Sequence, residues 1–188
     1  MGYLILGSIG FVFLTIFDFN KIKRWHGVFK TFFLIGISLI GLSTLSLFFI
    51  PVTVFSPPFW LAGFFYILAL LAGLLMFYAL FGALPFKKTY VEDKENQTID
   101  TGVYALCRHP GVWGFFMMYL FLFLATGNIL LLYACILWTA LDIIHVWIQD
   151  VYFFPKTLQG YETYQQTTPF LLFNKESFST CVRTLKRI

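Results

Sequence analysis

The sequence contains few charges. Asp, Glu, Lys and Arg together make up 12% of its 188 residues, against roughly a quarter in an ordinary soluble domain. The formal net charge is +4, but the basic residues are scattered near the ends of apolar segments and form no patch interleaved with aromatic residues. A soluble globular fold and a nucleic-acid partner are therefore both excluded.

Cysteines and the common catalytic motifs are also scarce. The three cysteines, Cys107, Cys135 and Cys181, form no C-x-x-C pair and no metal-ligand spacing, so we expect free thiols and no metal site. The sequence has no G-x-G-x-x-G, G-x-x-x-x-G-K-[ST], H-E-x-x-H or G-x-S-x-G motif. Nucleotide-binding folds of the soluble type and the common hydrolase mechanisms are thus unsupported.

Long apolar segments fill most of the chain. Hydrophobic residues make up 59% of it, and 25 residues are Phe. A bilayer core of about 30 Å requires roughly 20 apolar residues in a helix, and this length criterion selects five segments. We predict an all-α, polytopic membrane protein with five transmembrane helices, folded as a single integral membrane domain over residues 1–188. The predicted spans are residues 1–19, 29–50, 59–81, 111–126 and 129–148.

The last two predicted spans form a helical hairpin. The apolar run from Gly111 to Ile148 is too long for one span, and it contains the turn signal Thr126-Gly127-Asn128. Its first arm is short, about 15 residues, which is ~22 Å at the helical rise. Because the two ends of a hairpin meet at one membrane face, we expect residues 87–110 and 149–170 to form a site there.

The basic residues indicate the orientation in the membrane. Lys21, Lys23 and Arg24 follow the first span, whereas residues 51–58, after the second span, carry no charge. The basic segments before the fourth span and after the fifth fall on the same side as the first basic loop. By the positive-inside rule, we predict an external N-terminus, a cytoplasmic C-terminus and, in a prokaryote, a location in the cytoplasmic membrane.

One polar cluster comes directly before the fourth span. Pro110 stands where a helix would begin, and proline is favoured there because its missing N–H is not needed. The free N–H groups of the first helical turn can hold an anion together with Arg108, and Gly114 lets a ligand approach the backbone. Alternatively, Arg108 extends to the lipid headgroups and His109 caps the helix.

Further polar residues lie in and after the fifth span. Asp142, His145 and Gln149 share one helix face, and Asp150 follows at the membrane edge. Ionisable residues within a span usually face the bundle interior or a water-filled cavity, which makes them functional candidates. The alternative is a hydrogen-bonded pair of Asp142 and His145 that only fixes helix packing.

Two tyrosines follow in a segment that is too polar to span. Tyr161 and Tyr164 precede Pro169 and can stack on a flat ring or donate hydrogen bonds. The alternative is that they belong to the aromatic belt at the membrane interface.

In combination, these motifs resemble one enzyme family. The pattern Gly102-x-Tyr104-x-x-x-Arg108-His109-Pro110-x-x-x-Gly114, then a helical hairpin, then Tyr161-x-x-Tyr164-x-x-x-x-Pro169 is similar to the isoprenylcysteine carboxyl methyltransferases, which are integral membrane enzymes. The wider group includes phospholipid N-methyltransferases. The resemblance covers Gln97 to Pro169 in order and spacing.

The resemblance implies methyl transfer from S-adenosylmethionine, bound in a cytoplasmic pocket. The acceptor would be a lipidated or membrane-partitioned molecule, such as a prenylcysteine carboxylate, a phospholipid amine or a small thiol. Cofactor binding is thereby assigned to Gly102, Tyr104, Arg108, His109, Pro110, Gly114, Gln149, Tyr161 and Tyr164, and catalysis to Arg108, His109 and Asp150. The family's R-I-x-x-E-E pattern reads here as His145, Gln149 and Asp150, and the loss of one acid concerns the acceptor more than the methyl donor.

Two other functions are compatible with the same residues. A membrane reductase resembling the steroid 5α-reductase group has a similar Arg-His-Pro helix and tyrosine segment and binds NADPH, but such proteins usually have more than three spans before the motif. A non-catalytic membrane protein that retains the pocket would bind cofactor without turnover. Small residues such as Gly36 permit close helix contacts but form no firm dimer motif, so the oligomeric state is not predicted.

Overall fold

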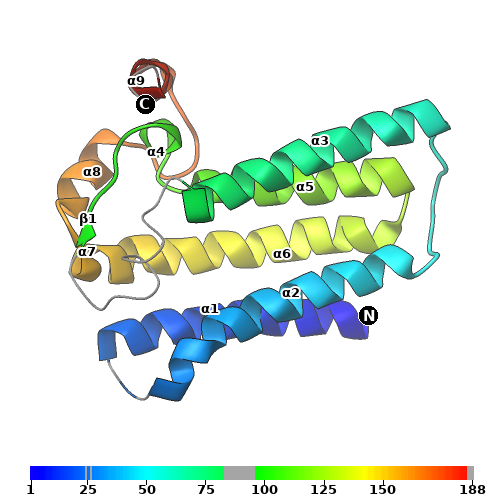
Figure 1. Cartoon of the computed structure of the whole chain (residues 1–188), viewed down its shortest axis with the longest axis horizontal. Helices are drawn as coiled ribbons and strands as arrows, with labels where there is room; N and C mark the ends of the chain where they lie inside the picture. The colour runs from blue at the N-terminus through cyan, green and yellow to red at the C-terminus, as the bar shows by residue number, and fades with distance from the viewer. Residues whose placement is uncertain (24, 26, 83–95, 186–188) are drawn as a thin grey trace.

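The computed structural model describes residues 1–23, 25, 27–82 and 96–185, and five long helices lie lengthwise in it (Figure 1). They are α1 (Gly2–Lys23), α2 (Phe32–Phe49), α3 (Phe59–Phe77), α5 (Pro110–Thr126) and α6 (Ile129–Ile148). A short 3₁₀ helix, η1 (Gly27–Thr31), precedes α2, and a π turn, η2 (Tyr78–Gly82), continues α3. α1 packs on α2, α3 packs on α5, and α6 contacts both α1 and α5.

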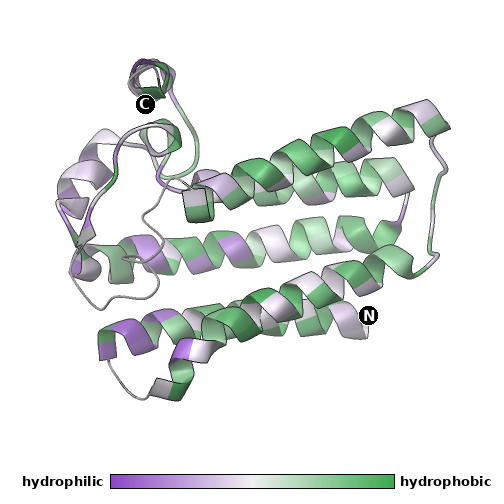
Figure 2. Ribbon diagram, viewed as in Figure 1, coloured by the Kyte–Doolittle hydropathy of each residue, from purple (hydrophilic) through white to green (hydrophobic). Residues whose placement is uncertain are grey.

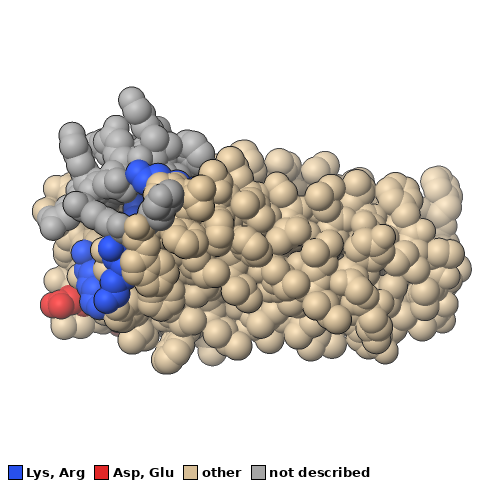
Figure 3. Space-filling model, turned by 90° about the horizontal axis from the view of Figure 1, so that it is seen from below, with Lys and Arg blue, Asp and Glu red and all other residues tan. Residues whose placement is uncertain are grey.

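Most of the long helices meet the length and composition of a membrane span. Four segments are long and apolar enough to cross a bilayer, namely Gly2–Lys23, Gly27–Phe49, Phe59–Gly82 and Ile129–Thr157, while α5 is shorter, with 17 residues. Hydrophobic residues cover most of these helices (Figure 2), and the face seen in Figure 3 carries Lys and Arg at one end only. The structure thus confirms an all-α membrane protein with four helices of spanning length.

Close contacts between small residues hold the helices together. A Cβ on Gly10 would lie 2.8 Å from the carbonyl oxygen of Gly36, and the reverse is also true, so α1 and α2 touch backbone to backbone. Trp138 is fully buried in α6, and its indole Nε1 donates to the carbonyl of Leu4 at 3.1 Å. Tyr119 and Thr44 share a hydrogen bond that joins α5 to α2. Packing and interhelical hydrogen bonds are the forces available between helices in lipid.

The predicted turn between the last two helices is confirmed. Gly127 ends α5 with φ +66°, a left-handed conformation that glycine adopts without strain, and a Cβ there would lie 1.8 Å from the carbonyl oxygen of Phe55. The Asn128 side chain accepts from Leu130 N at the start of α6 and donates to the carbonyls of Leu47 and Ile50. The turn and the loop after α2 therefore lie together at the end of the bundle where the chain starts (Figure 1).

The opposite end of the bundle, here called the site end, carries the shorter elements. They are β1 (Asn96–Gln97), α4 (Val103–Leu106), η4 (Gln149–Phe153), α7 (Phe154–Thr157), β2 (Leu158–Gln159), α8 (Tyr161–Thr167) and α9 (Lys175–Leu185). β1 and β2 pair in parallel over two residues each, a small addition to the predicted all-α fold. The predicted site segments 87–110 and 149–170 meet here, although residues 87–95 lie outside the described residues.

Candidate active site

The site is built around Asp150, at a wide turn that follows α6. η4 is a π turn, and the proline that follows it, Pro155, has no N–H to donate to the carbonyl four residues earlier. The regular α-helix ends at Ile148 and continues directly into this π turn, where Asp150 is buried, with an exposed fraction of 4%. A buried carboxylate requires partners that compensate for its lost hydration.

Three side chains form hydrogen bonds with this carboxylate, and a fourth, that of Arg108, forms an ion pair with it. Arg108 Nε lies 3.0 Å and His109 Nε2 lies 3.3 Å from Oδ1, and the Tyr161 hydroxyl donates to the same oxygen at 2.6 Å. Gln165 Nε2 donates to Oδ2 at 3.2 Å and to the Asp150 carbonyl at 2.8 Å. These donors come from the segment before α5 and from α8. Asp150 therefore joins the two segments that the sequence motifs predicted to form the site.

Arg108 retains one donor that is not satisfied. Its Nη1 donates to the carbonyl of Gln165 at 2.9 Å, but the Nε–H is buried and has no aligned acceptor among the described residues, despite the nearby Asp150. The guanidinium carbon lies 5.7 Å from the centre of the Phe170 ring. The Arg108 backbone N–H donates to the carbonyl of Pro169 at 2.9 Å, which fixes this segment against the chain that follows α8.

Aromatic rings enclose the polar groups. The His109 ring is stacked on Phe154, with centroids 5.9 Å apart, and meets Phe170 edge-on at 5.0 Å. Phe154 also contacts Tyr161 at 5.2 Å, and Tyr161 contacts Tyr164 at 5.7 Å. The site thus has the ring faces that a flat ligand would require.

Burial sets the protonation states of the site. It lowers the pKa of His109 below the ordinary value of 6.5, with Asp150 acting in the opposite direction, so the imidazole favours its neutral form. Burial, and then Asp150, raise the pKa of Tyr161, so the phenol keeps its proton and donates it to the carboxylate. Burial also raises the pKa of Cys107 to about 11, which leaves this neighbouring thiol unreactive.

A second chain of contacts holds α4 beside the site. The Tyr164 hydroxyl donates to the Tyr104 carbonyl at 2.6 Å, and the Tyr104 hydroxyl donates to the Ala79 carbonyl, in the π turn after α3, at 2.8 Å. Gly102 precedes α4 with φ +62°, and its N–H donates to Thr184 Oγ1 of α9 at 3.0 Å. Gly102 and Tyr104 therefore connect the site to α3 and α9 and do not contact Asp150 through any hydrogen bond in the described chain.

The remaining predicted residues of α5 lie at and beyond its first turn. Pro110 is the first residue of the helix and is buried, as expected from its missing N–H. Gly114 faces α3, where a Cβ would lie 2.8 Å from Met76 N and 2.9 Å from the Ala72 carbonyl oxygen. The structure gives Gly114 a packing contact, and its predicted contact with a cofactor stays a prediction.

Gln149 belongs to a separate cluster between α6 and α1. Its Nε2 donates to Asp18 Oδ2 at 2.8 Å and lies 3.2 Å from His145 Nε2. His145 Nδ1 shares a hydrogen bond of 3.0 Å with Thr15 Oγ1, and its Nε2 lies 3.6 Å from Asp18 Oδ2. In the described residues, His145 is thus bonded to α1 and not to Asp142, which contradicts the alternative that Asp142 and His145 form a pair that only fixes helix packing.

Three alternatives drawn from the sequence are also contradicted by the geometry. Arg108 is paired with Asp150 and its side chain is only 12% exposed, so it does not extend to headgroups. His109 makes no side-chain hydrogen bond that caps α5. Tyr161 and Tyr164 are buried at 3% and 5% exposure, which does not fit an aromatic belt.

Several residues of both clusters were not predicted. Gln165 lies one helical turn after Tyr161, on the same face of α8, and that spacing would have indicated it. Asp18 is an acid inside a predicted span, which by itself marks a functional or packing position. Phe154, Phe170 and Thr15 carry no signal that separates them from the many other apolar and hydroxyl residues of the chain.

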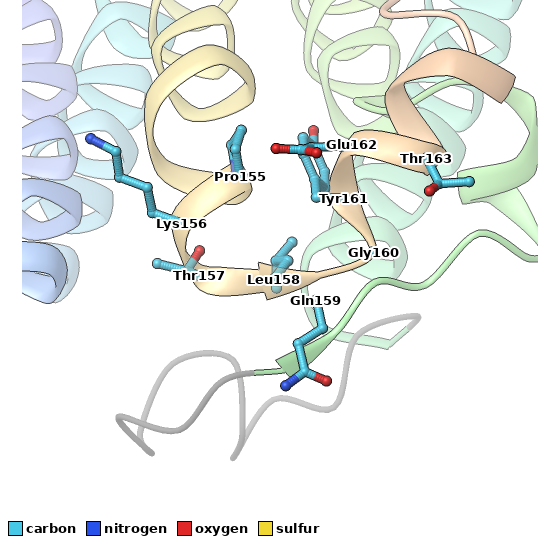
Figure 4. Close-up of a pocket in the computed structure, with 9 residues that line it drawn as sticks. All are labelled: Pro155, Lys156, Thr157, Leu158, Gln159, Gly160, Tyr161, Glu162 and Thr163. Carbon is cyan, nitrogen blue, oxygen red and sulfur yellow. The ribbon is translucent and has the colours of Figure 1, made fainter.

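A shallow pocket lies beside this site. It has a volume of about 300 Å³ and is lined by residues 155–163, from α7, β2 and the start of α8 (Figure 4). Tyr161 is the lining residue that also contacts Asp150.

A comparison with protein families identifies the central part of the chain. A family model described as phospholipid methyltransferase matches residues 59–151, about half of the chain. These residues belong to the phospholipid methyltransferase family. No curated protein and no solved structure matches the chain significantly.

The phospholipid methyltransferase match covers part of the site. It includes Arg108, His109 and Asp150 and ends one residue after the last of them, at the π turn. The α8 partners of Asp150, Tyr161 and Gln165, lie beyond it. The family is a group of membrane methyltransferases that includes the isoprenylcysteine carboxyl methyltransferases. The resemblance noted from the sequence is therefore confirmed. The match also favours methyl transfer over the reductase alternative.

Proposed function

We propose that this chain is an S-adenosylmethionine-dependent methyltransferase whose site is the Asp150 cluster. The observation that supports it most directly is the convergence of Arg108, His109 and Tyr161 on one buried carboxylate, at the end of a phospholipid methyltransferase domain. Such a concentration of buried polar groups is costly to maintain, so it requires a role. Methyl transfer from the cofactor is the chemistry that the family supplies.

The residues present suit this cofactor. Its carboxylate requires a cationic donor, and Arg108 has a buried Nε–H without an aligned acceptor. Its adenine requires ring faces, which Phe154, Phe170 and Tyr161 offer. Its sulfonium is stabilised by a nearby carboxylate or ring face, and Asp150 and the tyrosines supply both. When bound, the cofactor supplies an activated methyl group attached to a good leaving group.

In this proposal, Asp150 orients the side chains around it, and His109 accepts the proton from the methyl acceptor. A carboxylate that accepts three side-chain hydrogen bonds and pairs with an arginine is a weak base, so Asp150 fixes the positions of Arg108, His109, Tyr161 and Gln165. With Nε2–H donated to Asp150, the neutral His109 has its lone pair on Nδ1 and can take a proton from a thiol or amine acceptor. A carboxylate acceptor would need only positioning. Exclusion of water by the aromatic rings and a fixed orientation of the reactants lower the activation barrier of such reactions by about 7–11 kcal/mol.

The proposal also includes the number of transmembrane spans and the side of the membrane on which the site lies. α5 crosses the membrane as the fourth of five spans, because it lies beside α3 and α6 and its 17 residues extend about 26 Å at the helical rise. Lys21 and Lys23 end α1 at the site end, so the positive-inside rule places this end in the cytoplasm and the N-terminus outside. The acceptor is a lipidated or membrane-partitioned molecule that enters from the bilayer.

The deciding measurement is cofactor binding by calorimetry on the detergent-purified protein. S-adenosylhomocysteine is expected to bind, and Arg108→Ala is expected to abolish binding. Arg183→Ala, which removes an exposed arginine of α9, is the control and should bind as the wild type does. Binding of NADPH in place of S-adenosylhomocysteine would overturn the proposal in favour of a reductase. Binding without turnover on any thiol, amine or carboxylate acceptor would make the chain a non-catalytic protein.

A further inference from the structure

The C-terminal helix α9 presents three different faces. Ser177, Cys181 and Thr184 lie on the face that packs against α4, and the first two are buried. Lys175, Ser179 and Arg183 form an exposed polar face, at intervals of four positions along the helix. Phe178, Val182 and Leu185 form an exposed apolar face, with exposed fractions of 57%, 40% and 44%. Eleven residues thus divide into a protein-facing, a polar and an apolar sector.

The segment before α9 extends this apolar surface. Leu172 and Phe173 are 75% and 54% exposed. The indole Nε1 of Trp113 donates to the Leu171 carbonyl at 2.9 Å, and the Trp113 and Phe173 rings lie 6.3 Å apart. Trp113 is in the first turn of α5, so these contacts hold the segment at the level where an apolar helix begins.

The direction of α9 also differs from that of the bundle. In Figure 1 the five long helices run across the picture, whereas α9 is seen nearly along its own axis. A helix that crosses the bundle direction at its end lies in the plane of a membrane that the bundle spans. Tryptophan side chains such as that of Trp113 are enriched at the membrane–water interface, which is the depth expected for such a helix.

From these observations we propose that α9 is an interfacial helix that binds the lipid surface. Phe178, Val182 and Leu185 enter the boundary between headgroups and acyl chains, while Lys175 and Arg183 face the phosphates and water. Interfacial helices with this division of residues bury their apolar face by about 5–10 Å. Lipid is the occupant that fits, because the exposed apolar surface lies at the end of an apolar bundle and carries basic residues beside it.

One hydrogen bond connects α9, the proposed lipid-binding helix, to the candidate site. Thr184 Oγ1 accepts from the N–H of Gly102, the residue before α4, and α4 carries Tyr104. An α9 held by the membrane therefore holds the start of α4. The proposal itself concerns lipid only and stands or falls independently of methyl transfer.

The test is the depth of two neighbouring positions in the membrane. Nitroxide labels are attached to Phe178→Cys and Ser179→Cys in phosphatidylcholine proteoliposomes, with labelled wild type as background, since the three native cysteines are buried. Both substituted residues are exposed and one residue apart, on the apolar and the polar face. The label at position 178 should be several-fold more accessible to oxygen, relative to a water-soluble nickel complex, than the label at position 179.

Two outcomes would overturn the proposal. Equal and high accessibility of both labels to the nickel complex would show that α9 lies in water. Spectral broadening at position 178 that disappears when labelled protein is diluted with unlabelled protein would show that a second copy covers the apolar face in place of lipid.

Discussion

The Tyr161 hydroxyl donates a 2.6 Å hydrogen bond to Asp150 Oδ1, eleven residues earlier in the chain, and thereby connects α8 to the end of α6. Hydrogen bonds to a charged group contribute about 1.5–3 kcal/mol. Tyr161→Phe keeps the ring and its contact with Phe154 but removes this donor. We expect the affinity for S-adenosylhomocysteine, measured by calorimetry, to fall by about tenfold or more.

The matched control is Glu162→Gln, on the exposed side of the same helix. It should leave the affinity unchanged. If Tyr161→Phe binds as tightly as the wild type, the hydroxyl has no part in holding the site.

Asp150 offers a way to separate orientation from proton transfer. Asp150→Ala removes the carboxylate that pairs with Arg108 and accepts hydrogen bonds from His109 and Tyr161, and turnover should fall at least tenfold. Asp150→Asn keeps an oxygen that can accept from them, so it should retain more activity than Asp150→Ala if the carboxylate only orients. Equal loss in the two variants would assign a charge or base role to Asp150, and unchanged turnover in Asp150→Ala would remove it from the mechanism.

The neutral state of His109 predicts how stability responds to pH. Burial lowers the pKa of the folded state below the ordinary value of 6.5, so folding disfavours the protonated form. The contribution of His109 to stability is therefore complete above the unfolded pKa and is lost as pH falls towards the folded pKa. Melting temperatures between about pH 5 and 8 should drop faster on acidification in the wild type than in His109→Asn. Parallel curves for the two proteins would contradict the assignment.

The helices and the hairpin could be predicted because their signals are local. The length of each apolar run defines a span, and Gly127 and Asn128 carry the chemistry of a turn in their own side chains and backbone. The association of Arg108, His109, Asp150 and Tyr161 followed from motif order combined with the hairpin. Neighbouring Gln149 and Asp150, by contrast, serve different clusters because the π turn and the packing of α1 against α6 separate them, and neither is visible in the residue pattern.

The cluster between α1 and α6 should stabilise the bundle. Thr15→Val removes the hydroxyl that bonds His145 Nδ1 but keeps the side-chain volume, and we expect a loss of about 0.6–2 kcal/mol in the free energy of unfolding. Ser8→Ala is the control, since the Ser8 hydroxyl donates to the Leu4 carbonyl of its own helix. Unfolding in detergent measures both variants. A double-mutant cycle with His145→Ala should give a coupling energy different from zero, and additive losses would show that the bond is not stabilising.

Alanine substitutions at Gly114 and Gly111 test whether Gly114 serves helix packing or cofactor binding. An alanine Cβ at position 114 would lie 2.8 Å from Met76 N, whereas at position 111 the nearest atom, in Leu80, is 3.8 Å away. Overpacking against the α3 backbone should cost Gly114→Ala about 1–3 kcal/mol of stability, while Gly111→Ala should be neutral. Folded Gly114→Ala protein should still bind S-adenosylhomocysteine, because the strain lies between α3 and α5. The opposite pattern, a normal melting temperature with lost binding, would assign Gly114 to the cofactor, since only a ligand close to the backbone would then detect the added methyl group.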